Sequence, residues 1–412
     1  MSVENRIGVI GNVDSGKSTL TGVMLYGELD DGRGKAREKI FNHPHEKDKG
    51  KTSSISHNSM KIDKTSKRSL AFIDLAGHEK YLKTTLHGLS GYLIDYGMLL
   101  INGSEEGGVL KMTREHFSII LALNIPVMIV VTKIDMAQGD IIQQTLKKIQ
   151  KMVTNMCRRR KMKRTIHMVN SEEDYVELTP DVIPLFQVSN KTGENIQLLR
   201  HYLYGLKENK MVRDNSKYDK LFSIEGRFMV PNIGNVVCGK MLAGQINKND
   251  KLFLGPIDGK WTQIVAKSFH DNFKNTVESL NMGETGTIAF AFSDKNYKNT
   301  FRKRKNNTKG LVIVSSKDNL DSLHTSYFEA MVRVLVNHST TIKEKYQPII
   351  NCGKIVQAAQ IVKIYDNNVL RAGDFARIRF KFLYKPEFLE LDDTFLFREG
   401  KTKGIGKIVQ IG

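Results

Sequence analysis

Cysteine is scarce in this sequence. The 412 residues include three cysteines, Cys157, Cys238 and Cys352, and no two of them form a C-x-x-C pair. An odd number of widely spaced cysteines argues against a disulfide framework and against a cysteine-based zinc site. We therefore expect a protein of a reducing compartment, and we predict a cytoplasmic location.

Long hydrophobic runs are missing as well. The longest apolar stretches, such as residues 126–131, have the length of a β-strand, whereas a membrane-spanning helix needs ~20 apolar residues. The first five residues lead directly into a strand-like run, so no signal peptide is expected there. The sequence therefore predicts no membrane association, and we expect a monomer.

Acidic residues are outnumbered. The chain has 63 Lys and Arg against 44 Asp and Glu, a net charge of +19. The excess is spread over the chain, with 32 basic and 24 acidic residues in 1–213 and 31 and 20 in 214–412. Such a balance favours a large polyanionic partner, a nucleic acid above all. The alternative is a merely basic protein with no such partner.

The most informative stretch fits the pattern G-x-x-x-x-G-K-[ST]. It consists of Gly11, Asn12, Val13, Asp14, Ser15, Gly16, Lys17 and Ser18, and Thr19 follows it. Residues 6–10 are typical of a buried strand and 18–29 of a helix, which is the context that a phosphate-binding loop needs. Glycines let the backbone fold round phosphates, and N–H groups at the helix start point at the anion. We expect Lys17 to reach the β- and γ-phosphates and Ser18 to bind Mg²⁺.

The order of elements predicts three domains. Residues 1–213 alternate strands (69–74, 96–101, 127–131, 182–188) with helices (111–123, 140–157, 194–206), which indicates a doubly wound, mostly parallel α/β sheet. Residues 30–67 are polar and carry no clear periodicity. Short strand-like runs separated by Gly, Asn and Asp then predict two all-β barrels, in 214–318 and 319–412.

Two further motifs extend the phosphate site. Asp74 and Gly77 follow a strand in the pattern D-x-x-G, which would place a carboxylate near Mg²⁺, through water, and a backbone N–H near a γ-phosphate. Thr52 lies in the polar region at a point where it can supply a second hydroxyl to Mg²⁺. Segments that γ-phosphate and Mg²⁺ order are the usual switches of GTPases. Taken singly, these motifs could also be turns or solvated loops.

The sequence Thr132-Lys133-Ile134-Asp135 follows the buried strand and approaches the guanine motif N-K-x-D. A carboxylate at Asp135 can accept from the ring N–H and from the exocyclic amine of guanine, a donor pair that adenine lacks. Lys133 would lie along the base. Because Thr132 replaces asparagine and is shorter, we expect weaker tethering there. Ser189 and Asn190 follow the last strand, where a backbone N–H would meet the guanine O6.

Together these motifs resemble those of the translational GTPases of the elongation factor Tu and elongation factor 1-alpha class. The tail at 397–406 resembles that class as well. Within the class the match is closest to the GTP-binding protein 1 family, on residues 27–34, 50–54, 74–85, 131–136 and 188–190. Thr132 also matches that family. The resemblance covers nearly the whole chain.

The resemblance implies a GTPase domain followed by two β-barrels, with GTP or GDP and Mg²⁺ as ligands. It also implies that GTP-bound protein carries aminoacyl-tRNA to the ribosome, which triggers hydrolysis. His78 matches the catalytic histidine of the class. Of the two apolar residues that gate this histidine in elongation factor Tu, Val13 matches one, whereas Lys51 replaces the other.

Two other functions stay open at this point. A GTP-switched RNA-surveillance or ribosome-rescue protein could recruit RNA-decay machinery, and no feature of the sequence separates it from a tRNA carrier. A metabolic enzyme with a phosphate loop, such as a sulfurylase subunit, is disfavoured by Asp135 and His78. The basic runs 158–164 and 302–305 are candidates for RNA phosphates or solvated surface loops.

Overall fold

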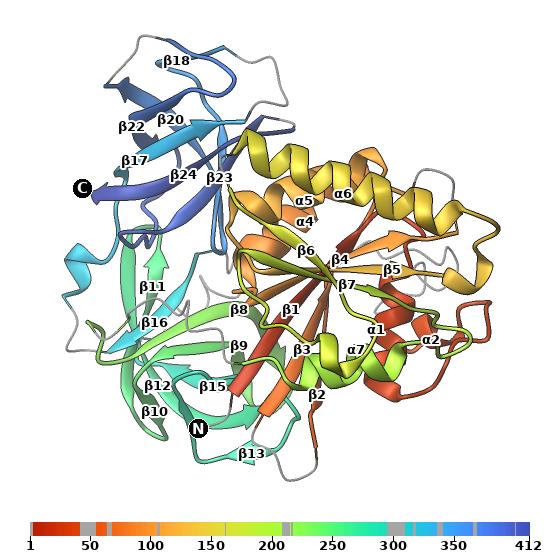
Figure 1. Ribbon diagram of the computed structural model, residues 1–412. Helices are drawn as coiled ribbons and strands as arrows, with labels where there is room; N and C mark the ends of the chain where they lie inside the picture. Colours follow the sequence, from red (N-terminus) through yellow and green to blue (C-terminus); the bar gives the residue numbers. More distant parts are fainter. Residues whose placement is uncertain are drawn as a thin grey trace. The chain divides into compact units, whose positions relative to one another are not determined.

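The computed structural model (Figure 1) describes residues 3–41, 55–63, 68–104, 108–160, 162–207, 215, 217–294, 310–315, 319–335, 341–365, 369–399 and 401–412. The chain divides into an amino-terminal unit, Glu4–Met211, and a carboxyl-terminal unit, Val212–Gly412, which also includes Met1–Val3. The domain limits predicted at 213/214 and 318/319 have at least one residue each outside the described ranges, and they stay predictions.

A seven-stranded sheet forms the centre of the amino-terminal unit, in the order β2-β3-β1-β4-β5-β7-β6. The parallel pairings β1–β4, β4–β5, β5–β7 and β6–β7 make the sheet mostly parallel, while β2 runs antiparallel to β3. The strands are β1 Val3–Gly11, β2 Ser56–Lys61, β3 Arg68–Asp74, β4 Tyr96–Asn102, β5 Val127–Thr132, β6 Thr165–Met168 and β7 Val182–Gln187. The predicted mostly parallel α/β sheet is confirmed.

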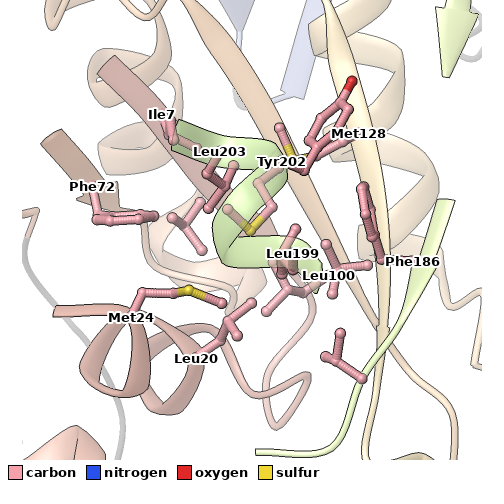
Figure 2. Packing of buried hydrophobic residues seen from close by; sticks show 14 of the residues in the cluster. Ile7, Leu20, Met24, Phe72, Leu100, Met128, Phe186, Leu199, Tyr202 and Leu203 are labelled. Atoms are coloured by element: carbon pink, nitrogen blue, oxygen red, sulfur yellow. The ribbon is translucent and has the colours of Figure 1, made fainter. Parts of the chain in front are cut away.

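Helices pack on both faces of this sheet (Figure 1). The helices are α1 Lys17–Tyr26, α2 Lys35–Glu38, α4 Leu82–Gly91, α5 Lys111–Ala122, α6 Ile141–Arg159 and α7 Ile196–Tyr204, with short 3₁₀ turns η1 Glu79–Tyr81, η2 Ile134–Met136 and η3 Glu172–Asp174. Figure 2 shows how Leu199 and Tyr202 of α7 lie with Leu20 of α1 against the strand residues Leu100 and Phe186. Strands that are buried on both faces read as continuous apolar runs, as β5 does.

Two strands and two helices of the amino-terminal unit escaped the sequence patterns, among them α4. The polar region 30–67 contains α2 and the edge strand β2, and β6 forms the opposite edge of the sheet. The side chains of β2 are mostly half-buried, because an edge strand has only one neighbour. Its sequence, Ser-His-Asn-Ser-Met-Lys, therefore lacks the apolar alternation that predicts a strand.

The first barrel closes through the ring β11-β16-β8-β9-β15-β12, in which β12 pairs back with β11. Its strands are β8 Leu221–Val230, β9 Gly234–Ala243, β11 Lys251–Ile257, β12 Lys260–Asp271, β15 Thr285–Phe292 and β16 Val312–Ser315, with β10 Gln245–Asn247, β13 Thr276–Val277 and β14 Ser279–Asn281 beside them. These strands pair antiparallel, and Phe222, Ile264 and Phe269 contribute to a core of buried side chains.

The second barrel is closed in the order β17-β22-β20-β19-β23-β24. Its strands are β17 Tyr327–Val334, β19 Ile349–Cys352, β20 Ile355–Ile364, β22 Phe375–Phe382, β23 Thr394–Glu399 and β24 Lys401–Ile411, preceded by the turn η4 Leu320–Ser322 and flanked by β18 Ile342–Lys343 and β21 Val369–Leu370. A cluster of aromatic rings, Phe328, Phe380 and Phe395, fills its interior. The expectation of two all-β barrels after the α/β domain is confirmed.

Candidate nucleotide-binding site

The glycine-rich loop connects β1 to α1 with an unusual backbone. Gly11 has φ +151°, Asp14 has φ +61° and Gly16 has φ +79°. At Gly11 a Cβ would lie 2.4 Å from the carbonyl oxygen of Leu100, so only glycine fits there. The loop ends where α1 begins, at Lys17. The first N–H groups of a helix have no partner within the helix, so this end of α1 is suited to bind an anion.

Lys17 is buried at the centre of this loop, and its Nζ donates to the Asn12 carbonyl oxygen at 2.7 Å. Burial lowers the pKa of the Lys17 amine, while the negative charges of Asp74 and Asp14 oppose that shift. A cation withdrawn from water is stabilised by a nearby anion. The loop therefore favours a negatively charged ligand at Lys17.

Ser18 and Asp74 meet beside Lys17, although they are far apart in the sequence. The Ser18 hydroxyl donates to Asp74 Oδ2 at 2.6 Å, and Asp74, at the end of β3, is fully buried. A hydroxyl and a carboxylate are hard oxygen ligands of the kind that Mg²⁺ accepts, usually together with phosphate oxygens and water. The pair fits Mg²⁺ better than a metal held by protein alone, because the described residues contain no cluster of three His, Cys, Asp or Glu. Thr52 lies outside the described residues.

Gly77 lies directly against the phosphate loop. A Cβ at this position would be 2.5 Å from Lys17 Nζ and 2.7 Å from the Gly11 carbonyl oxygen. His78 follows on the exposed side and caps η1, since its Nδ1 accepts from the Lys80 backbone N–H at 3.1 Å. A ring nitrogen that accepts carries no proton, so the neutral His78 has its proton on Nε2. In this arrangement Nε2 is a donor that can orient a water molecule.

The base motif is tied to the phosphate loop. The Thr132 hydroxyl donates to the Ser15 carbonyl oxygen at 2.9 Å, a buried hydrogen bond to the loop backbone. That threonine tethers the loop less strongly than asparagine would stays a prediction. A Cβ on Gly16 would come within 3.6 Å of the Asn190 amide nitrogen. Lys133 adopts a left-handed backbone, with φ +59°, at the start of η2.

Asp135 is exposed and held by the loop after β7. The buried Ser189 hydroxyl donates to Asp135 Oδ1 at 2.6 Å, and Ser189 Oγ accepts in turn from the Thr192 N–H at 3.0 Å. Asp135 Oδ2 takes no part in this hydrogen bond and could accept from a guanine. The sequence placed Asp135 and Ser189 in the site but gave no sign of this hydrogen bond, which joins residues 54 positions apart.

His116 is a site neighbour that the sequence patterns missed. It lies fully buried on α5, and neither ring nitrogen has a hydrogen-bond partner among the described residues. Burial, together with the charge of Lys17, lowers the pKa of His116 to about 3. The ring is therefore neutral near pH 7 and adds no second positive charge beside Lys17. A single histidine in an amphipathic helix has no spacing that marks it as special.

Residues 4–212 match the model of the elongation factor Tu GTP binding domain. GTP-binding protein 2 of Homo sapiens is 35% identical over 435 aligned positions, which cover 98% of this chain and 69% of that protein. The chain belongs to the elongation factor Tu-type GTPase family. This GTPase is also 39% identical to GTP-binding protein 1 of Xenopus laevis, over 99% of its own length but only 64% of the length of that relative.

Solved structures show the same fold. Translation elongation factor SelB from Methanococcus maripaludis, in complex with a GTP analogue, superimposes with a TM-score of 0.68 at 17% identity, over the whole of this GTPase and 80% of SelB. Among the described residues of this GTPase, no helix is long and apolar enough to cross a membrane.

Proposed function

We propose that this protein binds GTP, hydrolyses it, and in its GTP form carries aminoacyl-tRNA to the ribosome. Membership of the elongation factor Tu-type family supports the GTPase activity. The proposal for tRNA rests on one observation in the carboxyl-terminal unit, a surface where cations and aromatic rings alternate.

Hydrolysis requires a charged phosphate chain to be held in place and an attacking water to be oriented. Lys17 and the loop amides would neutralise the phosphate charge, and the Gly77 N–H would bind the γ-phosphate. Ser18 and Asp74 would hold Mg²⁺, which neutralises charge on the phosphates when bound. His78, with its Nε2 proton, would orient the water. Asp135 would select guanine, with Lys133 along the base and the backbone of Ser189 and Asn190 at O6.

The surface that carries the tRNA proposal lies on the second barrel. Alternation along β22 buries Ala376, Ile378 and Phe380 and turns Arg377, Arg379 and Lys381 outward. We call these three side chains, together with Tyr327, Lys363 and Tyr365, the basic-aromatic face. Register places Tyr327 opposite Lys381.

Each ring of the basic-aromatic face is flanked by two cations. Arg379 and Lys381 lie 5.4 and 5.3 Å from the Tyr327 ring centre, and Lys363 and Arg377 lie 4.9 and 5.5 Å from that of Tyr365. Glu329 beneath them accepts from Arg377 Nε at 2.7 Å, which holds the guanidinium in position. Ordered cations beside aromatic faces suit the phosphates and sugars of RNA.

Binding of charged and uncharged tRNA, each with GTP or GDP, tests the proposal. We expect tight binding only for charged tRNA with GTP, and a decline of affinity with rising salt. The double change Arg379→Ala and Lys381→Ala should weaken binding by about tenfold or more, since each lost phosphate contact costs about 1 kcal/mol. Lys251→Ala with Lys260→Ala, on the first barrel, is the matched control.

Two outcomes would argue against tRNA delivery. Equal binding in all four combinations would remove the carrier proposal and favour the RNA-surveillance alternative. Loss of binding in the control variant to the same degree as in the basic-aromatic variant would show that overall charge acts instead of this face.

A further inference from the structure

The loop that follows α1, residues 28–34, contacts the guanine side of the site rather than the phosphate side. The Asp30 backbone N–H donates to the Asn190 carbonyl oxygen at 2.9 Å. Asn190 belongs to the loop after β7 (residues 189–193, the base loop), in which Ser189 holds Asp135. A backbone hydrogen bond therefore connects the segment that follows the phosphate-binding helix with the base loop.

Leu29 makes a second contact between the two loops. Gly193 has φ +85°, and a Cβ placed on it would lie 3.1 Å from Leu29 Cδ1. Gly32 comes similarly close to the stem of Lys191, whose Cδ would be 3.5 Å from an added Cβ. The side chain of Leu29 nevertheless remains 45% exposed. Leu29 thus covers the outer edge of the base loop and is not part of the core.

The 28–34 loop is held in its shape by its own carboxylates. Asp30 accepts from the backbone N–H groups of Gly32 and Ala36 at 2.9 and 3.0 Å. Asp31 accepts from Arg33, Gly34 and Lys35, and these bonds lower the pKa of its carboxyl group. Local side-chain-to-backbone bonds of this kind fix turns. The loop is therefore an ordered support for the base loop.

Packing of α2 on α1 fixes the far end of the same loop. A Cβ on Gly22 would lie 2.1 Å from the Ala36 carbonyl oxygen, so α2 lies directly on α1. At the near end, Lys39 Nζ pairs with Glu28 Oε2 at 2.7 Å. The far end of the loop is thus packed on α1 through α2, and the near end is paired with Lys39, which follows α2.

We propose that Leu29 and the Asp30 amide are positioning groups that hold the base loop in place and so set how long guanine nucleotide stays bound. This inference rests on the guanine site of the proposed function, not on tRNA delivery. Asp135 can accept both guanine donors only while Ser189 and its loop stay in place. Loosening the support therefore speeds release of the base and leaves phosphate chemistry unchanged.

Release of a fluorescent GDP analogue from full-length protein, chased with unlabelled GDP, tests the proposal. Leu29→Ala should speed release about three- to tenfold, with little change in association, because contacts of this kind act mainly on the off-rate. GTP release should accelerate by the same factor, and single-turnover hydrolysis should keep its wild-type rate. Leu110→Ala, which changes another exposed leucine of the same unit, 38% exposed, should leave release unchanged.

A double-mutant cycle distinguishes the contact between Leu29 and Gly193 from a general loosening of the two loops. Gly193→Ala alone should speed release for two reasons: a side chain is strained at φ +85°, and the new methyl group displaces Leu29. The second part of the effect should vanish in the Leu29→Ala background, so the effect of Gly193→Ala should shrink there. Independent effects of the two changes, or wild-type release from Leu29→Ala, would overturn the inference and leave GTP binding intact. Failure of the wild-type protein to bind any guanine nucleotide would overturn the proposed function as well.

Discussion

The phosphate side and the base side of this site are built on different physical principles. On the phosphate side, Lys17 and Asp74 are buried, and Gly11 and Gly77 leave no room for a methyl group. On the base side, Asp135 is exposed and is held by a hydrogen bond from Ser189. Steric closeness and burial thus shape one half of the site, and hydrogen bonds between loops shape the other.

This difference has consequences for substitution. A group in close contact with backbone atoms tolerates no change in size. Substitutions on the phosphate side should therefore strongly reduce nucleotide binding or hydrolysis. A carboxylate on a loop can be exchanged for another polar group, so changes on the base side should alter which nucleotide binds and how long it stays. Four variants test this contrast, in order of decreasing expected effect.

Lys17→Met should cause the largest loss. Removing the buried amine leaves phosphate charge unpaired, a cost of about 3–5 kcal/mol, or two to four orders of magnitude in GTP and GDP affinity. Because burial lowers the pKa of Lys17, the charged amine destabilises the ligand-free fold, so the variant should melt no lower than wild type. Calorimetric titration and thermal melting measure both. Lys147→Met, on the exposed side of α6, is the control, and wild-type affinity in Lys17→Met would refute the assignment.

Asp135→Asn should change the preferred base from guanine to xanthine. The asparagine carbonyl oxygen can still accept from Ser189, so the loop should keep its shape, while its amide can donate to a carbonyl group where guanine has an amine. We expect GTP affinity to fall about 100-fold, since a charge-assisted hydrogen bond pair is lost, and xanthosine triphosphate to bind in its place. Competition between the two nucleotides measures this. Loss of GTP binding without any gain for the xanthine nucleotide would count against Asp135 as the base selector.

Gly77→Ala should slow GTP hydrolysis and leave GDP binding nearly unchanged. The added methyl group would lie 2.7 Å from the Gly11 carbonyl oxygen, and we expect the segment that carries Gly77 to shift away from the phosphate loop to relieve this contact. We expect hydrolysis to slow by about tenfold or more, as for loss of one backbone donor to a developing charge, with GDP affinity near wild type. Gly205→Ala, at a helix end with ordinary contacts, is the control. An equal loss of GDP and GTP affinity would mean that Gly77 only supports the fold.

The features that could be predicted from sequence are those encoded in short stretches. The loop from Gly11 to Ser18 has its strand and helix immediately beside it, and Asp74, Gly77 and Asp135 each follow an apolar run that marks a strand end. The parallel sheet follows from such runs as well, because strands buried on both faces are continuously apolar.

The features that could not be predicted depend on contacts between distant residues. Nothing near Ser189 in sequence indicates that it holds Asp135, and nothing near Asp30 indicates Asn190. The basic-aromatic face combines three strands, so the isolated basic runs of the sequence, 158–164 and 302–305, did not point to it. Residues 302–305 lie outside the described part of the chain, as do Lys51 and Thr52, and their roles stay predictions.

Thr132→Val should give the smallest effect, and it tests how the phosphate side and the base side are connected. It removes the hydroxyl that donates to the Ser15 carbonyl oxygen at 2.9 Å and keeps the side-chain shape. A lost buried hydrogen bond costs about 1 kcal/mol, or roughly fivefold faster GDP release. Thr132→Ser keeps the hydroxyl and should release GDP at nearly the wild-type rate. If the valine and serine variants release GDP equally fast, the hydroxyl does not connect the base motif to the phosphate loop.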